Sequence, residues 1–207
     1  MAVREVSHRG GNMIGHFPSL KLRRMVAFES LIEQDYIYLL DYERDVTFYE
    51  EQPLTIEYPW EGKARHYTPD FCVERDQAHE LIECKPQSKV DTDENQRKFS
   101  AAREWCQANG WTFLVITDQA LRTGPRLANV KLLTRYARLE VDQTVALRVA
   151  DCLEKKPSWT IEELAAEVNP ADMRQGMTAL LHLAFHHRLC LDLTTEVISP
   201  RTRLSLP

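Results

Sequence analysis

The sequence predicts an α/β domain followed by a smaller, mainly helical domain, and three observations carry this prediction. Apolar residues recur at helical spacing over residues 21–42 and again over 93–109. Between and after these segments lie short runs rich in β-branched and aromatic residues, which are typical of strands. After residue 138 the pattern changes to short amphipathic helices. We therefore expect two domains, residues 1–138 and 139–207.

The elements of the first domain follow from local signals. Residues 1–18 are glycine-rich and end in Phe-Pro, which predicts an irregular arm, and Ser19 is a candidate N-cap for a helix over 21–42. The predicted strands span residues 45–58 with a break at Pro53, 66–74, 79–85 and 111–117. The order of helix, antiparallel strands, helix and final strand predicts a central sheet flanked by helices.

The second domain has the sequence pattern of a winged helix. Three helices are predicted around Val145–Leu153, Ile161–Ala165 and Asp172–Leu183, and two extended runs follow at residues 189–193 and 204–206. Three helices and a terminal hairpin form a fold that often binds DNA and also serves as a protein-docking module. The sequence leaves both roles open for this domain.

Composition excludes several classes of protein. A chain of 207 residues with 43% hydrophobic residues can bury a sizeable core, and it has neither a signal-peptide pattern nor an apolar run long enough to span a bilayer. We expect a soluble cytoplasmic protein without a membrane partner. The five cysteines are widely spaced and form no C-x-x-C pair, so we expect reduced packing residues.

Basic residues are concentrated locally although the net charge is −5. No acidic residue occurs between positions 119 and 139, and the basic residues there are Arg122, Arg126, Lys131, Arg135 and Arg138. The N-terminal arm has a similar bias. These residues are candidates for contacting DNA phosphates or a partner protein, and the alternative is a solvated basic helix face.

Charged residues interrupt the two apolar runs of the stretch RHYTPDFCVERDQAHELIECKP, residues 65–86. Side chains alternate across a strand, so Glu83 and Lys85 share a face about 7 Å apart, and the hairpin brings Asp70 toward them. Burying such charges is costly without compensation, and a divalent cation would compensate them. The alternative is a hairpin with a surface ion pair.

Oxygen ligands favour Mg²⁺, with Mn²⁺ as a possible substitute. Such a cation would neutralise charge on a scissile phosphodiester and lower the pKa of an attacking water, while Lys85 orients that water or stabilises the developing charge. His182, His186 and His187 lie on a predicted helix, and the first two have metal-ligand spacing. Without supporting carboxylates or cysteines, a packed or solvated helix face is the better interpretation.

The hairpin residues resemble the PD-(D/E)xK nuclease superfamily at Pro69, Asp70, Glu83, Cys84 and Lys85. Within that superfamily the chain resembles TnsA, the endonuclease subunit of heteromeric transposases. The resemblance lies in the phrases GHFPSLK (15–21), VAFESLIEQDYIYLLDY (26–42), FYEEQP (48–53), RHYTPDF (65–71) and IECKP (82–86). The phrases TDQALR (117–122) and LANVKLLTRYAR (127–138) are similar to the passage into the family's C-terminal domain.

This resemblance implies a restriction-endonuclease-like core, with a central mixed sheet flanked by helices and a winged-helix-like C-terminal domain. It assigns catalytic roles to Glu29, Asp70, Glu83 and Lys85. The implied metal ligands are Glu29, Asp70, Glu83 and the backbone carbonyl of Cys84, and Gln96 is an accessory candidate. Some TnsA proteins carry Gln at the position of Glu83, so the part this residue plays in metal binding differs within the family.

The activity implied is a Mg²⁺-dependent DNA endonuclease that cuts one strand, at the 5′ ends, of each transposon end for cut-and-paste transposition. The implied partners are transposon-end DNA, a TnsB-type transposase and a TnsC-type AAA+ ATPase. Two alternatives stay open from the sequence: a non-catalytic DNA-binding or assembly adaptor of a transposition complex, and a restriction or repair nuclease that acts alone.

Overall fold

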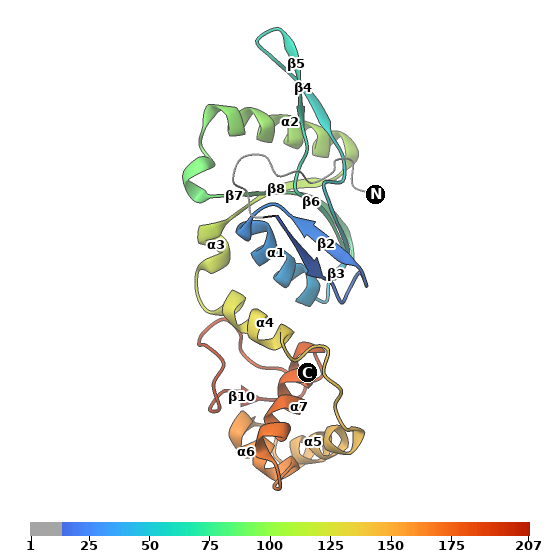
Figure 1. Ribbon diagram of the computed structural model, residues 1–207, viewed down its shortest axis with the longest axis vertical. Coiled ribbons are helices and arrows are strands. Elements are labelled where there is room, and N and C mark those ends of the chain that lie inside the picture. The colour runs from blue at the N-terminus through green and yellow to red at the C-terminus, as the bar shows by residue number, and fades with distance from the viewer. Residues whose placement is uncertain (1–13) are drawn as a thin grey trace. The chain divides into compact units, whose positions relative to one another are not determined.

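The computed structural model describes residues 14–207, which form two compact units (Figure 1). Unit 1 extends through Leu121 and unit 2 begins at Arg122. Most of the predicted N-terminal arm, residues 1–13, lies outside the described residues. Within 14–207, every helix is too short or too polar to cross a lipid bilayer.

Unit 1 is a mixed sheet with helices on both faces (Figure 1). Its elements are β1 (Gly15–Pro18), β2 (Met25–Phe28), α1 (Leu31–Tyr42), β3 (Val46–Glu51), β4 (Ile56–Trp60), β5 (Lys63–Tyr67), β6 (Phe71–Arg75), β7 (Ala78–Lys85), the 3-10 helix η1 (Gln87–Lys89), α2 (Asp93–Asn109), β8 (Thr112–Thr117) and α3 (Asp118–Arg122), whose last residue belongs to unit 2. The main sheet has the order β3-β6-β7-β8. Strand β7 pairs antiparallel with β6 and parallel with β8, because α2 carries the chain back across one face. The expected α/β architecture with a mixed central sheet is therefore confirmed.

The sheet is held by apolar clusters. On one side Leu81 of β7 packs with Ala102 and Cys106 of α2 and with Tyr58 and Tyr67 of the β4–β5 hairpin. On the helix α1 the ring of Tyr36 lies 6.2 Å from that of Phe71 in β6. Removing such apolar area from water stabilises the fold by about 25 cal/mol per Å². The strand segment that carries Glu83 is thus fixed by packing on either side of it.

The helix predicted over residues 21–42 is wrong over residues 21–30, nearly half of its length. Residues 15–28 instead form the antiparallel β1–β2 hairpin, and α1 begins at Leu31. The N-cap is Ser30, whose hydroxyl accepts a hydrogen bond from the Glu33 N–H at 3.1 Å. Glu29 therefore precedes the helix, and Glu33 occupies its first turn.

The strand predicted over residues 66–74 is interrupted. Strand β5 ends at Tyr67 and pairs with β4, whereas β6 begins at Phe71 and pairs with β3 and β7. Pro69 lies in the break, where its missing N–H costs no ladder bond. This break places Asp70 at the start of β6.

Unit 2 contains four helices after α3 and a small sheet. Its elements are α4 (Arg126–Thr134), α5 (Gln143–Lys155), β9 (Trp159–Thr160), α6 (Ile161–Val168), α7 (Met173–Phe185) and β10 (Arg203–Leu204). Strand β9 pairs antiparallel with β10, and Cys190 forms a further antiparallel bridge with Ser205. The helices predicted after residue 138 are present, and the extended segments are shorter than predicted.

The contacts divide the chain before α4, and not at the predicted position between residues 138 and 139. The buried Asn129 of α4 donates from Nδ2 to the carbonyls of Leu193 and Glu196 at 2.9 and 2.8 Å, and its Oδ1 accepts from the Ile198 N–H at 2.8 Å. These bonds attach α4 to the segment between Cys190 and β10. The sequence pattern could not reveal them, because they join residues more than sixty positions apart.

Two histidines attach the α4–α5 connection to α7. His182 Nδ1 lies 3.0 Å from the Tyr136 carbonyl oxygen, and His186 Nε2 lies 2.9 Å from that of Ala137. Burial lowers the pKa of His182. Both rings thus bind backbone, as the packing interpretation of these histidines expected.

Three of the five cysteines, Cys72, Cys84 and Cys106, are buried, Cys152 is half-buried and Cys190 is exposed. All five are free thiols. Burial raises the pKa of Cys72 and Cys106 to about 11 in each case. The expectation of reduced packing residues is met except at Cys190, which lies at the surface.

Candidate active site

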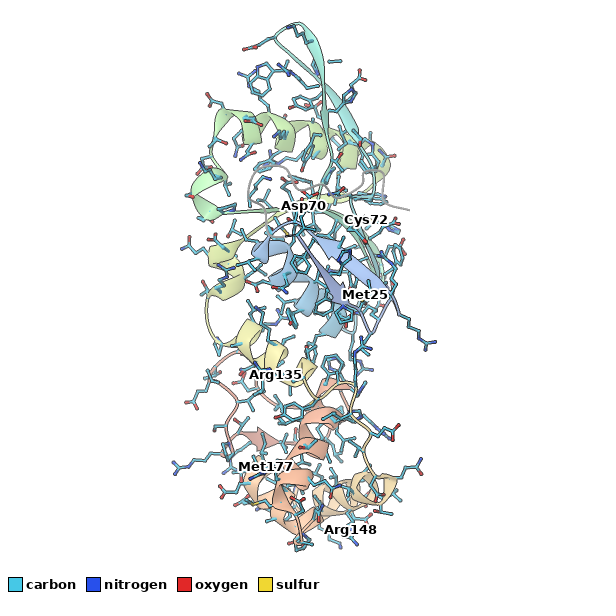
Figure 2. The ribbon with its side chains drawn as sticks, in the orientation of Figure 1. Met25, Asp70, Cys72, Arg135, Arg148 and Met177 are labelled. Carbon is cyan, nitrogen blue, oxygen red and sulfur yellow. The ribbon has the colours of Figure 1, made fainter. Side chains whose placement is uncertain are left out.

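Backbone bonds place Asp70 where three strands meet. Its N–H donates to the Ile82 carbonyl of β7 at 3.0 Å, and its carbonyl accepts from the Gln52 N–H at the end of β3 at 2.8 Å. Its carboxylate Oδ2 accepts a hydrogen bond from the Cys84 N–H at 2.7 Å. Asp70 lies in the central part of unit 1 (Figure 2).

Glu83 and Lys85 form an ion pair on one face of β7. Lys85 Nζ lies 2.5 Å from Glu83 Oε1, and the Tyr67 hydroxyl donates to Glu83 Oε2 at 2.6 Å. The Glu83 side chain is 2% exposed and that of Lys85 is 29% exposed. The alternation of side chains along the strand predicted this pairing, whereas the partner hydroxyl of Tyr67 could not be identified because the β4–β5 hairpin brings it there.

Two acids, Glu83 and Glu33, and one amine, that of Lys85, interact electrostatically with Asp70. Burial, together with the charges of Glu83 and Glu33, raises the pKa of the Asp70 carboxyl well above its usual range. Burial lowers the pKa of Lys85, but the carboxylates of Glu83 and Asp70 outweigh burial and raise it overall. The site therefore holds three carboxyl groups and one ammonium group in a largely buried position.

Glu33, in the first turn of α1, interacts electrostatically with both Asp70 and Glu83. Burial and the neighbouring charges of Glu29 and Glu83 raise the pKa of Glu33, against the lowering effect of two hydrogen bonds. One of these comes from the Glu29 N–H, which donates to Glu33 Oε2 at 2.8 Å. The Glu29 carboxylate accepts from Gln52 Nε2 at 3.1 Å. Sequence analysis missed Glu33 because it placed the helix start too early.

The other predicted site residues make contacts of their own. Gln96 of α2 donates from Nε2 to the Val90 carbonyl at 2.9 Å, beside η1. The five basic candidates lie at the end of α3, on α4 and directly after it, and Arg135 is the C-cap of α4 (Figure 2). All are exposed except the half-buried Lys131, and their predicted role in binding DNA or a partner stays a prediction.

The donor set suits a hard divalent cation by its chemistry. In the part of the chain that the structure describes, no three His, Cys, Asp or Glu side chains are grouped closely enough to hold a metal ion. Mg²⁺, however, is commonly bound by one or two carboxylates and keeps several waters. Asp70, with raised pKa and two acidic neighbours, is a group whose ionised form such a cation would stabilise.

An aspartate directly before one strand and Glu-x-Lys on the antiparallel neighbour, in a mixed sheet flanked by helices, agree with the arrangement that the PD-(D/E)xK resemblance implies. Residues 43–118 match the family model described as TnsA-like endonuclease N terminal. This segment is therefore similar to a TnsA-like endonuclease domain. A search of curated proteins gives no match to the chain. The matched segment includes Asp70, Glu83 and Lys85 and begins after α1, which carries Glu33.

Proposed function

We propose that the protein is the endonuclease subunit of a transposase, which hydrolyses one strand, at the 5′ ends, of each transposon end. The observation that carries this proposal is the convergence of Asp70, Glu83 and Lys85 inside a domain that matches the TnsA-like endonuclease family. Endonuclease, transposition and DNA-binding functions agree with that family.

The proposed cofactor is Mg²⁺ or, in its place, Mn²⁺. Asp70 and one further carboxylate, from Glu33 or Glu83, would hold it together with the Cys84 carbonyl, and water molecules would complete its coordination. When bound, the cation supplies Lewis acidity that neutralises charge on the scissile phosphate and activates a water. Lys85 holds a positive charge beside Glu83, where it stabilises negative charge that develops on the phosphate.

Unit 2 supports a docking role in the same complex. The order α5, β9, α6, α7, bridge and β10 is compatible with a winged helix, and β9 pairs with β10. We propose that unit 2 contacts transposon-end DNA or a TnsC-type ATPase, and that a TnsB-type transposase cuts the other strand. The exposed Arg126 of α4 and its exposed C-cap Arg135 are candidates for either contact.

Substitution of Asp70 tests the proposed activity directly. Asp70→Asn keeps the side-chain size and removes the charge, so we expect loss of 5′-strand cleavage by more than about 100-fold in the presence of the transposase and ATPase, the scale of a lost electrostatic partner. Glu33→Gln should act in the same direction, and chelation by EDTA should abolish cleavage. Asp76→Asn, in the exposed β6–β7 turn, is the matched control.

Strand-specific assays also separate the alternatives. If Asp70→Asn leaves both strands cut at normal rate, the protein is an adaptor and the proposal is wrong. Cleavage of transposon-end DNA by the protein alone, at the rate seen with its partners, would instead favour a nuclease that acts without them.

A further inference from the structure

Gln52, directly after β3, carries two unfavourable features at once. Its backbone adopts φ +48°, in the left-handed region that non-glycine residues rarely occupy. Its side-chain Oε1 is buried and has no hydrogen-bond partner among residues 14–207. A glycine would relieve the first and an apolar side chain the second, so the fold alone gives no reason for glutamine here. Such combinations are found where a residue serves a function.

The contacts of Gln52 join the acids on both sides of it. Its backbone N–H holds the Asp70 carbonyl at 2.8 Å, and its Nε2 donates to Glu29 Oε1 at 3.1 Å. Glu29 in turn donates its backbone N–H to Glu33. The chain of bonds Asp70, Gln52, Glu29, Glu33 therefore links β6 to the first turn of α1.

The orientation of the Gln52 amide is determined by Glu29. A carboxylate accepts hydrogen bonds only, so the NH₂ group must face Glu29 and the oxygen must face the other way. Oε1 is consequently an acceptor that needs a donor. A water molecule is the simplest donor that the site chemistry provides, because hydrolysis requires one.

We propose that Gln52 is a positioning residue of the endonuclease site, which fixes Glu29 and the Asp70 backbone through its N–H groups and orders a water molecule through Oε1. This inference rests on the proposed function. It also gives Glu29 a role: the Glu29 carboxylate holds the Gln52 amide, and the Glu29 backbone holds Glu33. Gln52 thereby supports two of the acids proposed to bind the cation, Asp70 and Glu33.

Gln52→Met removes both side-chain hydrogen-bonding groups at nearly constant volume. Removing such supporting partners typically weakens metal affinity or activity by about 10–100-fold. We therefore expect Mn²⁺ binding to the full-length protein, followed by electron paramagnetic resonance, to weaken by at least about 10-fold. In the reconstituted complex we expect kcat to fall while KM for transposon-end DNA stays unchanged. Gln77→Met, in the exposed β6–β7 turn, is the matched control.

An exchange of residues separates positioning from a general effect on folding. Gln52→Glu places a carboxylate opposite Glu29 and should weaken Mn²⁺ binding. The double variant Gln52→Glu with Glu29→Gln restores one amide-to-carboxylate bond with the partners exchanged, and we expect it to recover at least half of the lost kcat. Thermal melts confirm that each variant is folded at the assay temperature.

The outcomes distinguish this inference from the proposed function. If Asp70→Asn abolishes Mn²⁺ binding while Gln52→Met binds and cleaves like the unmodified protein, the role of Gln52 is wrong and the endonuclease stands. Failure of the exchange to recover any activity also counts against positioning. If neither Asp70→Asn nor Gln52→Met alters Mn²⁺ binding, the proposed metal site itself is wrong.

Discussion

Arg24 and Glu51 show how single residues hold the site in place from outside. The guanidinium donates from Nη1 and Nη2 to the two carboxylate oxygens at 2.7 and 2.6 Å, a bidentate pair that attaches the β1–β2 hairpin to β3. Glu51 is the residue before Gln52, so this pair also restrains the end of β3. Burial raises the pKa of Glu51, but the bonds from Arg24 outweigh burial and lower it overall.

The lowered pKa of Glu51 makes this contribution dependent on pH. A lowered pKa in the folded state contributes stability that is present above the unfolded value, about 4.3, and is lost as pH falls through the folded value. Glu51→Gln should therefore reduce the free energy of unfolding at pH 7 by about 1 kcal/mol, the upper end for a partly exposed pair. Urea unfolding at pH 7 and pH 3 measures the difference. An equal loss at both pH values would show that charge is not the cause.

Residue patterns predicted only part of the site. The period of two along β7 correctly placed Glu83 and Lys85 on one face, because that relation is local. The positions of Glu33 and Gln52 depend on the start of α1 and on the pairing of β3 with β6, which no short pattern contains. The residues that the sequence missed are thus those that reach Asp70 through tertiary structure.

At the scale of elements, helix α2 shows where periodicity is enough to predict an element, and the β1–β2 hairpin shows where it is not. Helix α2 was predicted at residues 93–109 and begins and ends there, because Thr92 caps its start and Gly110 adopts φ +72° at its end. Residues 21–28 fit both periods, since Val26 and Phe28 alternate as in a strand. A short apolar run of this kind does not distinguish helix from strand, and tertiary pairing decides.

The α6–α7 crossing depends on one glycine, Gly176. A Cβ added there would lie 2.7 Å from the backbone oxygen of Ala165, a group that cannot rotate away. Gly176→Ala should therefore lower the free energy of unfolding by about 1–3 kcal/mol, as in other overpacked cores. Helix propensity alone predicts the opposite sign, a gain of up to about 1 kcal/mol. Chemical denaturation of the full chain distinguishes these two expectations. Glu167→Ala, at an exposed position of α6, is the control.

At the scale of the whole molecule, the chain combines a unit that matches the TnsA-like endonuclease family with a second unit that includes α4. The sequence pattern changes after Arg138, yet the contacts divide the chain between Leu121 and Arg122, because α4 packs on α7 and bonds through Asn129 to the segment before β10. Composition marks where a pattern changes, whereas a domain boundary lies where few contacts cross. The two positions differ here by one helix.

This difference predicts how fragments of the second unit behave. A fragment of residues 122–207 retains α4 and should unfold cooperatively on heating, followed by circular dichroism. A fragment of residues 139–207 loses Asn129 and three buried apolar side chains, Leu127, Val130 and Leu133. Burial of each such side chain contributes about 1.5–3 kcal/mol, and their sum approaches the 5–15 kcal/mol by which a domain is stable.

The shorter fragment also leaves groups of the remaining fold without partners. It lacks the Tyr136 and Ala137 carbonyls that His182 and His186 contact, and the segment before β10 loses its bonds to Asn129. We therefore expect residues 139–207 to show no cooperative thermal transition under conditions in which 122–207 does. Equal melting temperatures for the two fragments would place the functional boundary after α4 and would mean that α4 is a linker. Absence of a transition only in the shorter fragment would show that α4 is part of the folded core of unit 2.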